Sequence, residues 1–474
     1  MSAIIESSYQ IVNDLVTPTL PVKYPRTTGY RPEPEDNKCN AWYWKCDIVG
    51  ASDGILMGKS VGIKDNVCIA GIPMMNGSKI MEGFVPDIDA TVVTRILDAG
   101  GRIVGKTNCE HLCFNASSWT NDTGPTLNPH DKSRSAGGSS SGSAVAVWNG
   151  DVDMAIGGDQ GGSIRIPASW CGIVGLKPTW GLVPYTGVVP IEITCDHVGP
   201  MARNVHDCAL LLEVIAGFDD GRDMRQSKCL KVPKYSQFLD GKLEGWKIGL
   251  VTEGFIGCDS DVESIVREAA KQLGKAGAEM EEVSVPMHTH GLAILLSICT
   301  DGGYQCMVRG TGAGYHYKGY YAESVMKHLF SGYKKEAKQL SENMKYACLC
   351  GKYIDKNYGN RFYGRAQNLN MQLTKAYDEA LANYDVIIMP TLPYKAPHLP
   401  TKYSSYQERF LNDHGTSKNT APFDCTGHPA ISINAGKSQG LPIGMMIVGK
   451  QFEDTKVLQA AFAFEQLQEK LFLY

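Results

Sequence analysis

Two glycine-rich segments carry most of the serine hydroxyls that could do chemistry in this chain. They are Gly137-Gly-Ser-Ser-Ser-Gly142 and Gly157-Gly-Asp-Gln-Gly-Gly-Ser163. Attack on a stable carbonyl requires an activated nucleophile, a base that accepts its proton, and donors directed at the developing oxyanion. Gly161 and Gly162 leave the backbone N–H groups before Ser163 unobstructed, so this turn can hold a negative oxygen. The two segments therefore favour acyl-transfer chemistry.

The base for such a reaction is usually histidine, yet His130 is the only histidine near either segment. A lysine can replace it where burial lowers the amine pKa from about 10.4, because the neutral amine then exists near pH 7. Lys64 is the candidate, since it ends the apolar run Val61-Gly-Ile63, and a serine of the first segment could pass the proton. On pattern alone, a lysine after an apolar strand is usually a surface charge, and glycine-serine loops are usually flexible connectors.

Strand-like and helix-like patterns alternate around these segments. Apolar residues at helical spacing predict a helix over 90–99, which Gly100-Gly101 ends before a strand over 102–105. The same order recurs later: a strand over 247–251, a helix over 261–276 and a strand over 279–285. Strand, helix and strand in sequence imply parallel pairing through right-handed crossovers. We predict an α/β fold with a single large mixed sheet flanked by helices.

The chain divides into an N-terminal segment over residues 1–55 and one large domain over 56–474. The first part is polar and proline-dotted, and its aromatic cluster Trp42-Tyr-Trp44 is expected to pack on the main body or on a second subunit. A tyrosine-rich helical insertion is predicted over about 286–382, with a long helix over 361–381. The sheet and a final helix are predicted to resume afterwards, with strands over 385–390, 430–433 and 443–448 and the helix over 455–468.

The composition is that of a soluble globular protein, with 474 residues, 43% hydrophobic and 20% charged, and a net charge of −4. This charge predicts neither nucleic-acid nor anionic-membrane binding. The longest apolar segment, 292–299, is shorter than the roughly 20 residues of a membrane helix, and the N-terminus lacks a signal-peptide pattern. The 15 cysteines are spaced like neither a disulfide scaffold nor a zinc site, so we expect reduced thiols and a cytoplasmic protein.

Three sequence blocks, in this order, resemble the amidase signature family of serine hydrolases. They are Gly62-Ile-Lys-Asp-Asn66, Gly137-Gly-Ser-Ser-Ser-Gly-Ser143 and Gly157 to Ala168, the last followed by Cys171-Gly-Ile-Val-Gly-Leu-Lys-Pro178. The resemblance covers roughly residue 56 to the C-terminus. It implies the amidase signature fold.

The resemblance also assigns roles to individual residues. It implies a Ser-cisSer-Lys triad with Ser163 as nucleophile, Ser139 as the middle serine with a cis peptide bond, and Lys64 as base. The implied oxyanion hole consists of the backbone amides of Gln160, Gly161, Gly162 and Ser163. Asp159 and Arg165 are expected to brace that loop, although an ordinary loop ion pair is an alternative for these two residues.

Within this family, the segments 72–77 and 181–187 and the Gly157-Gly-Asp-Gln160 variant are most similar to broad-specificity amidases of the nitrile-pathway type. The resemblance implies hydrolysis of small aliphatic or aromatic carboxamides to carboxylic acid and ammonia, without a metal or organic cofactor. A homodimer is possible, but the N-terminal segment here is shorter than in those enzymes. Thr391, Tyr394 and Asn419 are candidates for lining the substrate pocket.

Three alternatives remain open at this point. Gly138-Ser-Ser-Ser-Gly142 also matches the G-x-S-x-G nucleophile elbow of α/β-hydrolases, with Ser140 at its centre. The glutaminase subunit of a tRNA-dependent amidotransferase shares the same fold and triad. A non-catalytic binding protein that keeps the fold is the third alternative.

Overall fold

The computed structural model describes residues 2–405, 408–409 and 415–472. Its strands are β1 Trp42–Val49, β2 Ser60–Lys64, β3 Arg102–Thr107, β4 Met154–Asp159, β5 Val174–Lys177, β6 His197–Ala202, β7 Lys247–Val251, β8 Glu279–Val283, β9 Val386–Pro390, β10 Ala430–Ser438 and β11 Leu441–Val448. Within the described residues, these 11 strands form one mixed sheet in the order β1-β3-β2-β4-β6-β5-β10-β11-β9-β7-β8. The predicted α/β architecture with one large sheet is confirmed.

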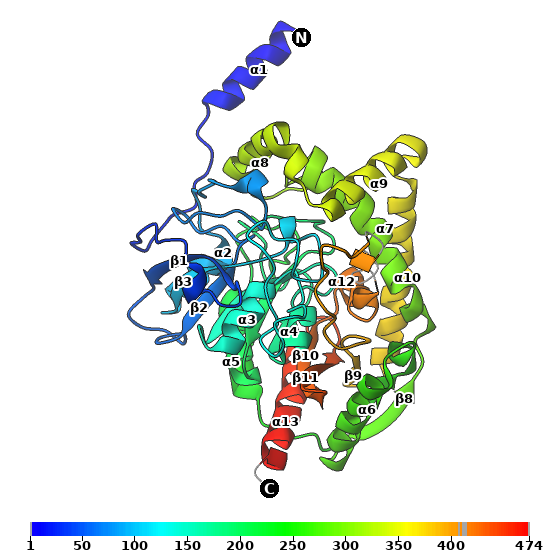
Figure 1. Ribbon diagram of the computed structural model, residues 1–474. Coiled ribbons are helices and arrows are strands. Elements are labelled where there is room, and N and C mark those ends of the chain that lie inside the picture. The colour runs from blue at the N-terminus through cyan, green and yellow to red at the C-terminus, as the bar shows by residue number, and fades with distance from the viewer. Residues whose placement is uncertain (1, 406–407, 410–414, 473–474) are drawn as a thin grey trace.

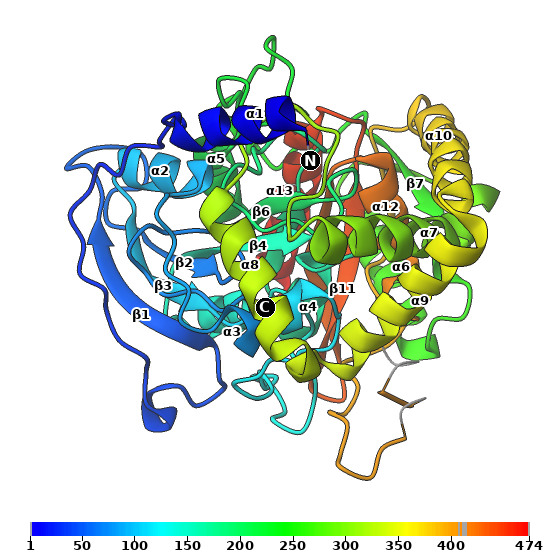
Figure 2. The ribbon, with the colours of Figure 1, turned by 90° about the horizontal axis from the view of Figure 1, so that it is seen from above.

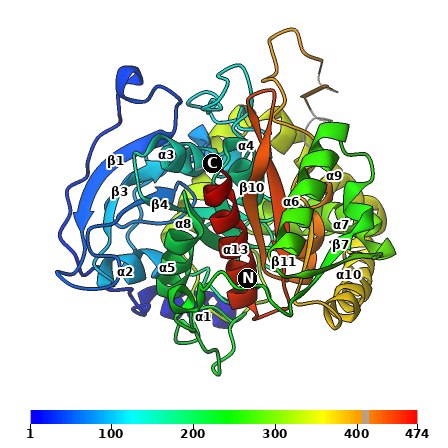
Figure 3. The ribbon, with the colours of Figure 1, turned by 90° about the horizontal axis from the view of Figure 1, so that it is seen from below.

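Helices pack on both faces of this sheet (Figure 1). The described helices are α1 Ala3–Asp14, α2 Thr91–Asp98, α3 Ser141–Asn149, α4 Arg165–Cys171, α5 Val205–Ile215, α6 Ser260–Lys275, α7 Gly291–Gly303, α8 Glu323–Glu336, α9 Glu342–Tyr358, α10 Arg361–Leu381, α12 Ala421–Thr426 and α13 Asp454–Phe472, and all of them except α1 contribute buried residues to the body of the molecule. Figure 3 shows α13 lying across the sheet beside β10, with α5 and α6 on either side of it. The helices predicted over 90–99, 261–276 and 361–381 correspond to α2, α6 and α10.

Strand pairing follows the predicted crossovers. β2 pairs in parallel with both β3 and β4, and β7 pairs in parallel with both β8 and β9. The antiparallel hairpin of β10 and β11 joins the two halves, because β10 pairs with β5 and β11 pairs with β9. The carboxyl ends of β2 and β4, which carry the first and third sequence blocks, therefore lie side by side.

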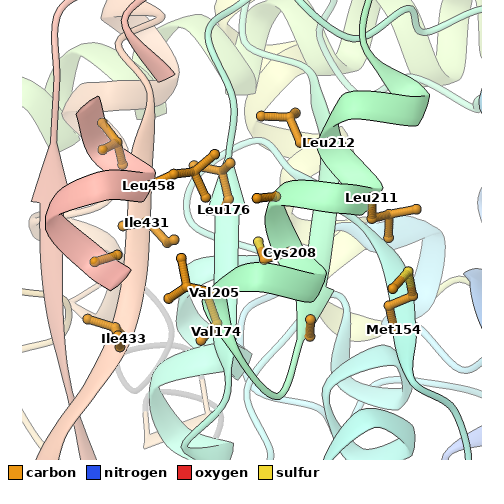
Figure 4. Close-up of a cluster of buried hydrophobic side chains, with 14 of the residues drawn as sticks. Met154, Val174, Leu176, Val205, Cys208, Leu211, Leu212, Ile431, Ile433 and Leu458 are labelled. Carbon is orange, nitrogen blue, oxygen red and sulfur yellow. The ribbon is translucent and has the colours of Figure 1, made fainter. Parts of the chain in front are cut away.

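The core beneath α5 and α13 shows how apolar spacing fixes these helices on the sheet (Figure 4). Leu211 and Leu212 of α5 are fully buried, as are Leu176 of β5, Ile431 of β10 and Leu458 of α13. Each such side chain stabilises the fold by about 1.5 to 3 kcal/mol relative to an exposed one. The periodicity of the helices is therefore explained by packing against this sheet face.

The N-terminal segment differs from the expectation of an irregular lead-in. β1 pairs antiparallel with β3, and Trp42 is 3% exposed, so the sheet begins before residue 55. The aromatic cluster packs on the main body, because its strand is part of the sheet. α1 was not predicted, and it projects away from the rest of the molecule with none of its residues buried (Figure 1).

The insertion forms a helical layer on the side of the molecule opposite β1, where α7, α9 and α10 gather (Figure 2). The apolar segment over 292–299 is part of a helical run, Pro286–Arg309, whose 24 residues are enough by length and composition to cross a membrane. The run is therefore longer than the sequence suggested. Half of its most apolar part is buried, and Ile294, Leu295 and Ile298 belong to one buried hydrophobic cluster with Leu373 of α10. This packing is that of a core helix.

Candidate active site

Lys64 lies at the carboxyl end of β2, the strand between β3 and β4. Its side chain is fully buried, as are those of Val61 and Ile63 before it. The Lys64 amine donates hydrogen bonds to Ser139 Oγ at 2.8 Å and to the Gly158 carbonyl at 3.2 Å. An amine held against a hydroxyl in the interior is positioned for proton exchange, and the surface-charge alternative for this lysine is wrong.

The first serine segment forms a loop between β3 and α3, and the peptide bond between Gly138 and Ser139 is cis. The backbone N–H of Ser140 donates to the carbonyl of Ser163 at 3.3 Å, which joins the two serine loops. The Ser140 hydroxyl donates to the Gly158 carbonyl and accepts from the Gly158 N–H, both at 3.1 Å. Because this hydroxyl is engaged with the main chain on both sides, the geometry does not support an elbow nucleophile at Ser140.

Ser163 lies between β4 and α4 and is 8% exposed. Within the described part of the chain, its hydroxyl has no hydrogen-bond partner, and the backbone N–H groups of Gln160, Gly161 and Ser163 have no protein acceptor. The Gly162 N–H is different, because it donates to the Asp159 carboxylate at 2.6 Å. This contact removes Gly162 from the expected set of oxyanion donors and leaves its neighbours free to bind a substrate oxygen.

A buried charge network holds this loop from below. Arg165 donates to both carboxylate oxygens of Asp159, each at 3.0 Å, and to Asp424 at 2.7 Å, and all three side chains are fully buried. Burial alone would raise the pKa of Asp159, but the Arg165 guanidinium outweighs it and holds that pKa well below its usual range. Burial and the nearby Asp159 charge raise the pKa of Asp424 well above its ordinary value. The two predicted bracing residues are therefore part of a three-residue network.

Residues of α12 and the turn before it support the same loop, and the sequence interpretation missed them. Thr420 donates from its hydroxyl to the Gly161 carbonyl at 2.6 Å, and its own carbonyl accepts from Arg165 at 3.0 Å. Gly162 has φ +130, and a Cβ on it would lie 2.4 Å from the Thr420 hydroxyl, so only glycine fits there. The available signal was Asp424, a carboxylate inside the apolar run of α12 that needs a buried partner.

A cavity of about 190 Å³ opens beside Ser163. Its walls come from the loop around η3 His111–Cys113, the nucleophile loop, α7 and α9. The residues that line it are mostly apolar, and no Asp, Glu, Lys, Arg or His is among those described: Cys113, Phe114, Asn115, Ala116, Gln160, Gly161, Ser163, Ile191, Leu292, Leu295, Leu296, Cys299, Thr300, Asn343, Tyr346, Ala347, Cys350 and Ser417. The insertion thus supplies the cavity wall.

The tyrosine-rich stretch 315–321 of the insertion contributes Tyr317 and Tyr320 to a separate pocket of about 50 Å³. The three residues expected to line the substrate pocket also lie elsewhere. Thr391 bonds to Ser432, and Asn419 donates to two backbone carbonyls, so both are engaged within the fold. Neither these two residues nor Tyr394 line the cavity beside Ser163. Among the described residues, no cluster of three or more His, Cys, Asp or Glu side chains could hold a metal ion.

The sequence model of the amidase family matches residues 38–458. This chain belongs to the amidase family. It is 42% identical to an enantioselective amidase from Rhodococcus rhodochrous over 462 residues, which cover 97% of this chain and 89% of that protein. It is also 36% identical to a glutamyl-tRNA(Gln) amidotransferase subunit from Methanosarcina acetivorans, over 93% of this chain and 92% of that protein.

Solved structures agree with this assignment. The native peptide amidase from Stenotrophomonas maltophilia matches with a TM-score of 0.73 at 30% identity, over 87% of this chain and 83% of that one. The protein therefore has the amidase signature fold and is an amidase, a hydrolase of amide C–N bonds. The resemblance indicated by the three sequence blocks is confirmed. Because the relatives include both an amidase and a component of an amidotransferase, the cavity is the feature that can separate their substrates.

Proposed function

We propose that this amidase hydrolyses small, uncharged aliphatic or aromatic carboxamides to carboxylic acid and ammonia through an acyl-Ser163 intermediate. The observation that supports this substrate class is the absence of Asp, Glu, Lys, Arg and His side chains among the described residues lining the cavity. Glutamine carries an ammonium and a carboxylate group at neutral pH, and burying either without a partner costs several kcal/mol. An uncharged amide avoids this cost, and apolar walls favour its acyl group by about 25 cal/mol per Å² buried.

Lys64, Ser139 and Ser163 act as a proton relay in this proposal. Lys64, as the unprotonated amine, accepts the proton of Ser139 while Ser139 accepts the proton of Ser163, whose Oγ attacks the amide carbon. The 2.8 Å contact between Lys64 and Ser139 supports the first transfer. The second transfer requires the Ser163 hydroxyl to turn toward Ser139, and catalytic hydrogen bonds commonly shorten once substrate binds.

The backbone N–H groups of Gln160, Gly161 and Ser163 bind the oxyanion of the tetrahedral intermediate. Removal of one such donor typically lowers kcat by about 10² to 10³-fold. Collapse of the intermediate breaks the C–N bond, and ammonia leaves with the proton returned along the relay. Water then attacks the acyl-Ser163 ester by the same path, which releases the carboxylic acid and restores the serine.

Ammonia release from acetamide, benzamide and glutamine tests this proposal. We expect turnover of acetamide and benzamide, little turnover of glutamine, and none of either amide by Ser163→Ala. Ser169→Ala is a matched control, because the Ser169 hydroxyl accepts from the Gly444 N–H at 3.1 Å outside the cavity. Glutamine turnover equal to that of benzamide would contradict the proposed substrate class.

We also propose that the protein is a cytoplasmic homodimer joined through α1. Ile4, Ile11 and Leu15 recur on one side of this region and are 80%, 58% and 66% exposed. The helix carries the acidic residues Glu6 and Asp14 and no basic residue, which disfavours an anionic membrane as its partner. Light scattering should give twice the chain mass for the full chain and the single mass after deletion of residues 1–16, whereas a monomeric full chain would contradict this proposal.

A further inference from the structure

Three thiols line the cavity beside Ser163, and the proposed hydrolysis uses none of them. Cys113 comes from η3, Cys299 from α7 and Cys350 from α9. Free cysteine usually serves as a small buried apolar residue. Three thiols from three separate elements around one substrate cavity instead place soft nucleophiles next to any bound ligand.

Cys113 is a cavity thiol whose surroundings include the catalytic residues Ser139 and Lys64. Its Sγ donates to Asn76 Oδ1 at 3.2 Å, and the Sγ of Cys109 donates to the same oxygen at 3.5 Å. It is also in hydrogen-bond contact with Ser139. Cys113 is 4% exposed and Ser163 is 8% exposed, so both are reached through the same cavity. A ligand whose carbonyl carbon lies at Ser163 therefore shares an enclosed space with this sulfur.

The surroundings of Cys113 favour its thiolate, the form of cysteine that reacts with electrophiles. Burial alone would raise the pKa of Cys113, but its contacts with Cys109 and Ser139, together with Lys64 whenever that amine is protonated, lower the pKa below its ordinary value. Cys299 is different, because its hydrogen bond with Cys195 and its burial raise its pKa well above the ordinary value. The two cavity thiols thus differ in reactivity by their contacts.

We propose that Cys113 is a covalent modification site for small carboxamides that carry a soft electrophile beside the carbonyl, such as 2-haloacetamides and α,β-unsaturated amides. This inference rests on the proposed function, because the carboxamide group is what brings the electrophile into the cavity. The attached group occupies the cavity and blocks Ser163, so modification inactivates the enzyme.

The chemistry requires no reactant other than the amide. With 2-iodoacetamide, the sulfur of Cys113 bonds to the methylene carbon, the C–I bond breaks, iodide leaves with the bonding pair, and the thiol proton passes to solvent. With acrylamide, the sulfur bonds to the terminal alkene carbon, and the carbon beside the carbonyl takes up a proton. In both cases the amide C–N bond stays intact.

Labelling with 2-iodoacetamide tests the inference. Peptide mass spectrometry should find Cys113 modified in step with the loss of benzamide hydrolysis, and benzamide at ten times its KM should slow this labelling about tenfold. Cys229 is exposed and outside the cavity, so its labelling should not respond to benzamide. Cys113→Ser should resist inactivation, whereas the matched variant Cys348→Ser, which changes a thiol of α9 outside the cavity lining, should not.

The same labelling of Ser163→Ala separates this inference from the hydrolysis proposal, because modification of Cys113 should persist without turnover. Hydrolysis of benzamide together with an unmodified Cys113 would overturn the inference and leave the proposed function intact. Modification of Cys350 or Cys299 in place of Cys113 would overturn it as well. Labelling of Cys113 that benzamide does not slow, in an enzyme that does not hydrolyse benzamide, would overturn both.

Discussion

Replacing Arg165 with methionine tests whether the buried charges beneath the nucleophile loop serve catalysis. Methionine has a similar length and removes the charge that Asp159 and Asp424 share. Breaking a buried ion pair costs about 3 to 5 kcal/mol, because it leaves a charge without a partner. With an unfolding entropy of about 1 kcal/mol/K for a cooperative chain of 474 residues, we expect the Tm to fall by about 3 to 5 °C.

The same substitution should reduce kcat. Asp159 holds the Gly162 N–H at 2.6 Å, so an Asp159 without its arginine no longer fixes the loop that directs the Gly161 and Ser163 N–H groups. Loss of one oxyanion donor lowers kcat by about 10² to 10³-fold, and we expect an effect of that size. Ammonia release from benzamide measures kcat and KM below both melting temperatures, and circular dichroism measures the Tm.

Arg26→Met is a matched control for this experiment. Arg26 donates to both oxygens of Asp89 at 2.6 and 2.9 Å, and this pair is also almost fully buried but connects other segments of the chain. We expect a comparable loss of Tm and an unchanged kcat. A wild-type kcat in Arg165→Met, or an equal fall of kcat in both variants, would refute the argument that the network positions the loop.

Three further outcomes follow from the site and its surroundings. Ser163→Ala should lose activity on the order of 10⁶-fold. Ser140→Ala should instead lose about 1 to 3 kcal/mol of stability, because its hydroxyl is hydrogen-bonded to buried main chain. Ammonia release and urea unfolding measure the two effects, and the reverse pattern would restore Ser140 as the nucleophile of an elbow. Gly162→Ala should lower kcat while the protein remains folded, because Gly162 has a φ of +130 and the added Cβ would lie 2.4 Å from the Thr420 hydroxyl. Full activity of this variant would show that the loop is not sterically fixed. Burial raises the pKa of Glu192 to about 7. Since the unfolded value is about 4.3, the folded state keeps a proton between these two pH values, and the free energy of unfolding should fall by about 3 kcal/mol as the pH rises from about 4.5 to about 7.5. Glu192→Gln cannot titrate, so in urea unfolding its free energy of unfolding should fall by about 3 kcal/mol less than that of the wild type over this pH range. Equal falls for both proteins would contradict the prediction.

Regular periodicity made part of the fold predictable. β7 and α10 have the predicted bounds, because each combines a clear apolar pattern with a marked end. β6 reads His-Val-Gly-Pro-Met-Ala, and its glycine and proline conceal a strand that is buried through pairing with β4 and β5. α1 was not predicted, because its sequence mixes polar and apolar residues. None of its residues is buried against the described fold. For β6, pairing with neighbouring strands stabilises a strand that the local sequence does not indicate.

The parts of the candidate site that lie in recognisable sequence blocks could be predicted. The parts that depend on loop geometry and on the three-dimensional path of the chain could not. The contact between Lys64 and Ser139 joins residues of two recognised blocks. The Gly162 N–H was misassigned because the choice between Asp159 and a substrate oxygen depends on loop geometry. The cavity walls come from α7 and α9, and no local pattern states how an insertion lies against a sheet.

The distance along the chain between Arg165 and Asp424, 259 residues, has a consequence for the synthesis of the enzyme. At translation rates of about 5 to 20 residues per second, the ribosome needs on the order of 13 to 50 seconds to make the intervening polypeptide. During that interval the guanidinium has only one of its two carboxylates, and the β10 and β11 hairpin that closes the middle of the sheet does not yet exist. We therefore expect nascent and prematurely terminated chains to have no amidase activity. Amide cleavage should start only when nearly the whole polypeptide has emerged from the ribosome.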